Sequence, residues 1–121
     1  MKEIKFRVWD KAQNKMYLWE NFRMKVNNGG WEIIPNDNQP TKRDRFEIMQ
    51  YTGLNDKNGK EIYEGDIVKT DHFQESNIII WGFHSDHSSY MYQLGWNLWE
   101  DVIYEVLGNI YENPELIKAS Q

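Results

Sequence analysis

The sequence predicts a mainly β protein, and three observations support that prediction. Aromatic residues make up 15% of the 121 residues, and their rings pack well on the pleated surface of a sheet. Ile4, Phe6 and Val8 alternate with charged residues, which is the period-two pattern of a half-buried strand. Alanine occurs only at Ala12 and Ala119, and helical periodicities are few. An α-helical bundle is therefore not expected.

The first part of the chain is predicted to form two hairpins. The opening strand is followed by a polar reversal over Asp10–Lys15, after which Met16 and Leu18 can return as its partner. Residues 23–34 form a second strand pair around Asn27, Asn28 and two glycines, a composition that suits a tight hairpin turn. An N-terminal β-hairpin region follows from these two patterns.

A polar segment from Pro35 to Asp44 separates this region from the rest of the chain. It contains two prolines and no apolar period, so it is predicted to be a connecting loop or mobile linker. The chain length allows one domain or two closely packed subdomains. We therefore expect an N-terminal hairpin subdomain with its linker over residues 1–45 and a second subdomain over residues 46–121.

Residues 49–68 are predicted to form a further hairpin, because apolar residues flank a loop of turn-forming residues. Gly59 is the expected position of positive φ in that loop. Gly53 and Gly65 each interrupt a strand pattern, which marks a bulge or a close backbone approach. Asp66 is expected to accept hydrogen bonds from nearby backbone N–H groups. The segment is therefore predicted to bend as well as to reverse.

Five strand candidates at short spacing follow the linker and indicate a small barrel or roll. Trp96, Trp99, Ile103 and Val106 recur at helical spacing, so a helical turn is expected before the last strand. Propensity alone does not separate an SH3-like barrel from another small barrel. The candidates are Phe46–Tyr51, Glu61–Lys69, Asn77–Phe83, Tyr90–Leu94 and Ile103–Tyr111.

The C-terminus is predicted to pass from a bent strand into a short helix. Gly108 and Asn109 fall within the strand pattern and are expected to form a bulge. Asn113 is a good capping residue, Pro114 suits the first helical position, and Glu115 places a carboxylate in the first turn. A short closing helix is therefore expected after Asn113.

These patterns together resemble the YopX family of small phage and prophage proteins. The resemblance rests on Met49–Val68, on Glu105–Leu116, and on Phe6–Asp10, which matches the family's Phe-Arg-x-Trp-Asp opening. It implies an SH3-like barrel for the C-terminal part and a phage or prophage setting, and it implies no particular reaction. We interpret the motif positions as structural: Thr52, Gly53, Asp56, Gly59, Gly65, Asp66, Gly108, Asn109, Asn113 and Pro114.

The charges are divided unevenly along the chain. Residues 1–45 hold ten Lys and Arg against six Asp and Glu, whereas residues 46–121 hold four against thirteen. Oppositely charged surfaces attract, so the basic part of one protomer is hypothesised to dock on the acidic part of a neighbour as a homo-oligomer. The alternative is that both faces are simply solvated.

No metal or cofactor is predicted. His72, His84 and His87 invite a metal-site interpretation, but the polar residues around them are explained equally well by a loop. Asp56 and Asp66, with Glu64 between them, are interpreted as turn residues and not as a catalytic cluster. The chain has no cysteine, which suits a cytoplasmic protein and excludes a disulfide scaffold, and the family resemblance implies that the cell is a bacterial host.

The chain is predicted not to be an enzyme. No serine lies in a Gly-x-Ser-x-Gly context, and Gly29 and Gly30 lack the lysine and spacing of a phosphate-binding loop. Nothing in the pattern therefore supports a nucleophilic or nucleotide-dependent reaction.

An interaction module is the preferred functional class, with itself or a host or phage protein as partner. The tryptophans of the C-terminal part are too many for a small barrel to bury completely, so some are expected to anchor an interface. The tentative interaction residues are Trp81, Trp96, Trp99, Arg43 and Arg45.

Nucleic-acid binding is the alternative. Cations of the basic half interleave with aromatic rings, an arrangement that suits single strands. The acidic C-terminal part would repel phosphate, and such rings are more often strand core. The residues concerned are Lys5, Arg7, Arg23, Lys25, Lys42, Arg43 and Arg45, with Phe6, Trp9, Trp19 and Phe22.

Overall fold

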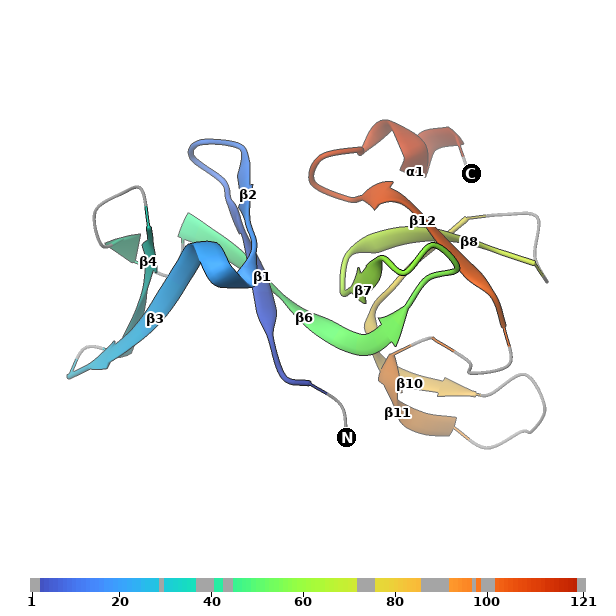
Figure 1. The fold of residues 1–121 in the computed structure, drawn as a ribbon, viewed down its shortest axis with the longest axis horizontal. Helices are drawn as coiled ribbons and strands as arrows, with labels where there is room; N and C mark the ends of the chain where they lie inside the picture. The colour runs from blue at the N-terminus through green and yellow to red at the C-terminus, as the bar shows by residue number, and fades with distance from the viewer. Residues whose placement is uncertain are drawn as a thin grey trace. The chain divides into compact units, whose positions relative to one another are not determined.

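The structure is a computed structural model that describes residues 3–28, 30–36, 41–42, 45–71, 76–85, 92–96, 98 and 102–119. These residues are mainly β, and every strand pairing among them is antiparallel (Figure 1). Within the described part of the chain, no helix is long and apolar enough to cross a membrane. The predicted mainly β class is confirmed.

The chain divides into two compact units. The N-terminal unit is Ile4–Gln50, and the C-terminal unit is Tyr51–Gln121 together with Met1–Glu3. The division falls within the strand β6, Phe46–Asn55, whose first half pairs in one unit and whose second half pairs in the other. The units therefore divide inside a strand, beyond the linker that the sequence pattern indicated.

The first hairpin of the N-terminal unit is confirmed. Strand β1, Phe6–Asp10, pairs with β2, Lys15–Tyr17, on one side and with the start of β6 on the other. The strand is formed as predicted, but its burial does not alternate, because Arg7, Val8, Trp9 and Asp10 are all buried. The core of this unit consists of Val8, Tyr17, Phe22, Ile33 and Phe46.

The second hairpin is also confirmed, but the expected linker is partly wrong. A 3-10 turn at Trp19–Asn21 leads into β3, Phe22–Asn27, which pairs with β4, Gly30–Pro35. Strand β5, Thr41–Lys42, then pairs with β4. The beginning of the expected loop is thus buried in β4 and part of its end is strand, because tertiary pairing overrides local composition. Residues 37–40 and 43–44 lie outside the described residues.

The C-terminal unit holds two described sheets besides the end of β6. Strand β7 pairs with β6, a three-stranded sheet has the order β12-β8-β9, and β10 pairs with β11. The core contains Ile62, Val68, Ile79, Val102 and Tyr104, whose burial contributes roughly 1.5–3 kcal/mol for each large apolar side chain. The strands are β7 Glu61–Tyr63, β8 Asp66–Thr70, β9 Asn77–Ile78, β10 Trp81–Ser85, β11 Tyr92–Trp96 and β12 Tyr104–Asn109.

The end of the chain follows the sequence prediction in part. Strand β12 and the helix α1, Glu115–Ala119, are both formed. Trp96, where a helical turn was expected to begin, lies instead in β11, paired with Trp81. Residues 97 and 99–101, over which that turn would continue, lie outside the described residues.

Candidate functional site

Asp56 joins the loop between β6 and β7 to the strand β12. Its Oδ1 accepts hydrogen bonds from the backbone N–H groups of Asn58 and Lys60, both at 2.9 Å. Its Oδ2 accepts a bond from the N–H of Val106 at 2.9 Å, and the N–H of Lys57 donates to the carbonyl of Tyr104 at 2.9 Å. The loop therefore satisfies backbone groups along β12 on the side away from β8, which protects that edge of the sheet.

The carboxylate of Asp56 is held in its ionised form. Burial alone would raise its pKa, but the N–H donors of Val106, Lys60 and Asn58, with the charge of Lys60, outweigh burial and hold the pKa below its usual value of 3.8. Gly59 completes the loop with a φ of +83°, as predicted. The group thus stabilises a turn and a strand edge at once.

Asp66 and Gly65 form the corner at which the chain leaves β7 for β8. The Oδ2 of Asp66 accepts the N–H of Tyr63 at 2.8 Å, which confirms the predicted backbone bond. Gly65 has a φ of +85°, so a side chain there would be strained. Its N–H donates to the Ile79 carbonyl and its carbonyl accepts from the Ile110 N–H. Both backbone groups of Gly65 are therefore hydrogen-bonded to other segments of the chain.

Thr52 and Gly53 bend β6. The pairing of β6 with β7 shifts register between Tyr51 and Asn55, and Gly53 within that shift has a φ of +87°. The Thr52 hydroxyl donates to the Ile62 carbonyl at 2.7 Å. The predicted bulge at Gly53 is confirmed.

Gly108 and Asn109 receive the side chain of Asn113. The register of β12 against β8 shifts between Val106 and Gly108, as predicted for this segment. Asn113 Oδ1 accepts the N–H of Asn109 at 3.1 Å, and a Cβ on Gly108 would lie 2.6 Å from Asn113 Cγ. The Asn113 side chain therefore holds the bulge, a role that differs from the expected helix cap. Pro114 follows it, and its carbonyl accepts the N–H of Ile117.

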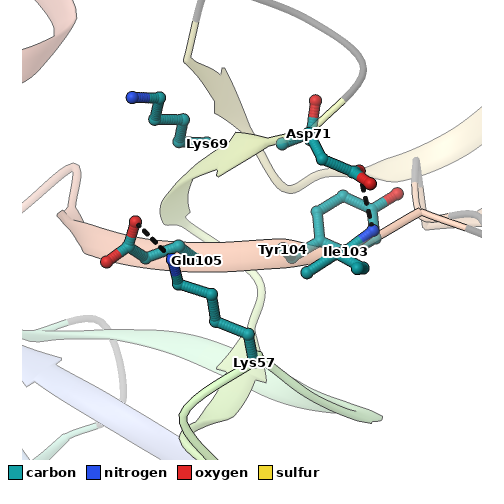
Figure 2. A pocket seen from close by; sticks show the side chains of 7 residues that line it. Lys57, Lys69, Asp71, Ile103, Tyr104 and Glu105 are labelled. Atoms are coloured by element: carbon teal, nitrogen blue, oxygen red, sulfur yellow. Dashed lines mark hydrogen bonds and ion pairs between the residues drawn. The ribbon is translucent and has the colours of Figure 1, made fainter.

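A cavity of about 220 Å³ lies beside the β8–β12 pair and the loop between β6 and β7 (Figure 2). Lys57 reaches from the loop to Glu105, with Nζ and Oε1 3.5 Å apart, while Lys69 extends away from that pair. Asp71 Oδ1 accepts the N–H of Ile103 at 3.0 Å. The cavity is lined by Lys57, Lys69, Thr70, Asp71, Ile103, Tyr104 and Glu105.

Two large apolar side chains at β12 are exposed: Ile103 directly precedes the strand, and Leu107 lies at its register shift. Tyr104 is buried, whereas Ile103 and Leu107 are 56% and 40% exposed on either side of the half-buried Glu105. We call Ile103, Glu105 and Leu107 the β12 face. Sequence reasoning missed it, because residues 102–107 are apolar or aromatic except for Glu105 and carry no alternation that separates exposed from buried positions.

The tentative interaction residues are distributed over both units. Trp81 is half exposed at the start of β10, and Trp96 lies in β11 with its side chain outside what the structure describes. Arg43 and Trp99 lie outside the described residues. Arg45 donates two hydrogen bonds within its own unit, to Asp10. Arg45 therefore has a structural role within the N-terminal unit.

Asp10 anchors the turn after β1 to the start of β6. Arg45 Nε and Nη2 donate to its two carboxylate oxygens at 2.7 and 2.8 Å, and the N–H groups of Ala12 and Gln13 donate to Oδ1. Burial would raise the pKa of Asp10, but Arg45 and these N–H donors hold it below 3.8. Sequence reasoning missed this pair, because its members are 35 positions apart.

The structure describes one of the three histidines. His84 lies in β10, and His72 and His87 lie outside the described residues. Among the residues that the structure describes, no three His, Asp or Glu side chains are grouped as metal ligands.

Short antiparallel sheets, glycine bends and motif side chains bonded to the chain's own backbone define this as a small β protein with a structural motif. The chain belongs to the YopX family, whose model, described as YopX protein, matches residues 5–118. Its structure is similar to the one titled "Crystal structure of protein EF1440 from Enterococcus faecalis", with 29% identity and a TM-score of 0.57. That match covers 97% of this chain and 99% of the other. No curated protein matches the chain.

Proposed function

We propose that this protein is a non-enzymatic interaction module that assembles with further copies of itself. The observation that carries the proposal is the β12 face, on which two large apolar side chains remain in solvent beside charged groups. Apolar side chains with a polar rim are typical of docking surfaces. The half-exposed Trp81 supports the same class, since tryptophan is enriched among residues that dominate interfaces.

Charge complementarity supports a second copy as the partner. The basic residues 1–45 and the acidic residues 46–121 would attract each other between protomers. A contact between two different surfaces of the same chain is heterologous, and it closes into a ring when the rotation permits. Association through such a contact is expected to weaken as salt screens the charges.

The cavity beside the β8–β12 pair is small, which supports binding of a protein surface more than binding of a small molecule. At about 220 Å³ it is smaller than the roughly 300–1,000 Å³ typical of ligand pockets. Its charged groups include the half-exposed pair of Lys57 and Glu105, as expected for the rim of an interface.

Multi-angle light scattering across a salt series tests self-association. We expect a species larger than a monomer at low salt, and a smaller mean mass as salt rises. A monomer at every protein and salt concentration would contradict the proposal.

A pair of matched variants tests the β12 face. Ile103→Lys is expected to weaken association at least about tenfold, because it places a charge in the contact. Ile80→Lys is the control, since Ile80 is 51% exposed in the same unit but lies outside β12 and outside the basic residues 1–45. If both variants associate with the same affinity as the parent, the β12 face does not take part in self-association.

We also infer an SH3-like barrel in the C-terminal unit of a phage or prophage protein that acts in the bacterial cytoplasm. The bends at Gly53, Gly65 and Gly108 support the barrel, since bulges and glycine bends curl a sheet toward closure. Membership of the YopX family supports the setting, and the absence of cysteine supports a reducing compartment. An experimental structure with an open sheet would contradict the barrel.

Nucleic-acid binding through the N-terminal unit is the second candidate. The exposed Trp19, with Phe6 and Phe22 rings 5.8 and 5.6 Å away, favours it as a stacking surface. Trp9 and Phe22 are buried, however, which leaves fewer rings for bases. Anisotropy of a labelled single strand at low salt tests it, and an unchanged signal at micromolar protein would contradict it.

A further inference from the structure

Strand β3 is an open edge of the sheet β3-β4-β5 in the N-terminal unit. Its register with β4 pairs Asn27 with Gly30, next to a two-residue connection. In such a hairpin, hydrogen-bonded pairs alternate with non-hydrogen-bonded ones, so the N–H and C=O groups of Met24 and Val26 are directed away from β4. No described strand pairs with that side of β3. The edge can therefore accept a further strand.

The exposed side chains of β3 include two cations, Arg23 and Lys25. Arg23 and Lys25 are exposed and share one face of β3, while Met24, 37% exposed, lies on the other face. Neither cation makes an ion pair with any residue that the structure describes. Cations on an edge repel the same edge of another copy, which discourages edge-to-edge aggregation. They therefore favour a partner strand that carries negative charge.

We propose that the β3 edge binds an extended acidic segment of another protein by β-strand addition. Backbone hydrogen bonds to Met24 and Val26 would hold the segment in the sheet. Acidic residues at alternate positions would lie opposite Arg23 and Lys25, and the apolar residue between them would lie beside Met24. The recognised pattern is therefore acidic, apolar, acidic in an extended conformation.

A second copy of this chain is a poorer occupant of the edge. Pairing β3 with itself would bring four cations together, which costs free energy. In this chain's own sequence, Glu64 and Asp66 place two acidic residues at alternate positions, as the recognised pattern requires. Asp66 is buried, however, and accepts the N–H of Tyr63. Strand addition by a second copy is therefore not expected at the β3 edge, although Arg23 and Lys25 belong to the basic part of the chain proposed for self-association.

A labelled Glu-Val-Glu-Val-Glu peptide, titrated with the full chain at low salt, tests the proposal by fluorescence anisotropy. We expect saturable binding that weakens with salt, and amide shifts centred on Met24 and Val26 in the NMR spectrum. A peptide N-methylated on its edge-facing amides is expected to bind at least about tenfold more weakly, because it cannot donate to β3.

Protein variants separate the edge from general charge. The double variant Arg23→Gln, Lys25→Gln is expected to lose about tenfold in affinity. The control, Lys11→Gln with Lys60→Gln, makes the same change in net charge at residues outside β3 and is expected to bind like the parent. Circular dichroism verifies that each variant is folded.

Several results would overturn the proposal. With the peptide, they are no binding at up to about 1 mM protein, equal binding of the N-methylated peptide, equal loss in both double variants, and amide shifts that avoid β3. Binding of a single-stranded oligonucleotide in place of the peptide would assign the same cations to nucleic acid and would also overturn it.

Discussion

Asp56 Oδ2 accepts a hydrogen bond from the backbone N–H of Val106 at 2.9 Å, across 50 positions of sequence. The other oxygen of the same carboxylate accepts two N–H groups of its own loop. One side chain therefore closes the β6–β7 turn and fixes it to β12. A carboxylate is suited to this position because it is acceptor-only and has lone pairs for all three donors.

Replacing Asp56 with Ala is expected to destabilise the fold by about 2–4 kcal/mol, because three N–H groups lose a charged acceptor. Asp56→Asn is expected to have an intermediate effect, since its amide nitrogen cannot accept a bond. Urea unfolding followed by tryptophan fluorescence measures both changes.

Lys57→Ala is the matched control for the same loop. The Lys57 side chain is half exposed and pairs with Glu105 at the surface, so its loss is expected to cost about 0–1 kcal/mol. A loss for Asp56→Ala no larger than for Lys57→Ala would show that the carboxylate is not structural.

Acid is expected to destabilise the protein through Asp10 and Asp56. Both pKa values are lowered from 3.8, so the folded state binds fewer protons than the unfolded state. The stability that each group confers is complete above its unfolded pKa and is lost as pH falls through its lowered folded pKa. Urea midpoints from neutral pH to about pH 2 should decline below about pH 4, and less steeply in Asp56→Asn. Equal slopes would argue against a role for Asp56.

Gly108→Ala is expected to destabilise by about 1–3 kcal/mol, because its Cβ would lie 2.6 Å from Asn113 Cγ and 2.9 Å from Asn113 Cβ. Gly59→Ala meets no atom within 4 Å and is expected to cost about 1 kcal/mol from its positive φ alone. Because Asn113→Gly also removes the hydrogen bond to Asn109, each double variant is compared with Asn113→Gly alone. In that background Gly108→Ala should cost less than in the parent, and Gly59→Ala should cost the same. Thermal unfolding of the three single and two double variants tests this, and an unchanged cost of Gly108→Ala would exclude the contact.

Arg45→Lys is expected to lower the melting temperature, because lysine cannot make the two parallel bonds that Arg45 makes to Asp10. A double-mutant cycle with Asp10→Asn isolates the interaction between the two residues. We expect the effect of Arg45→Lys to shrink when Asp10 is already replaced. Additive effects would show that the two residues stabilise the hairpin independently.

Local chemistry made much of the fold predictable. Gly53, Gly59 and Gly65 could be assigned to bends because few other residues adopt positive φ, and all three have it. The strand around Val8 was also predicted from a local pattern, although both faces of that strand are buried. Predictions of this kind depend on residues a few positions apart, so they succeeded without knowledge of the tertiary structure.

Contacts between distant segments could not be predicted in this way. The sequence identified Asp56 as a turn residue, but its bond to Val106 depends on where β12 lies. Asn113 is a residue type that often caps helices, yet its side-chain Oδ1 accepts the N–H of Asn109, because the bulge brings that N–H within reach. The strand at Thr41 forms only because β4 offers a partner. The missing information in each case was tertiary.

Amide hydrogen exchange at Val106 tests the role of Asp56 most directly. In the native protein this N–H is expected to exchange as slowly as the paired amides of β8, and in folded Asp56→Ala it should lose protection while the β8 amides retain theirs. Unchanged protection of Val106 in that variant would contradict the conclusion that the carboxylate joins the loop to β12.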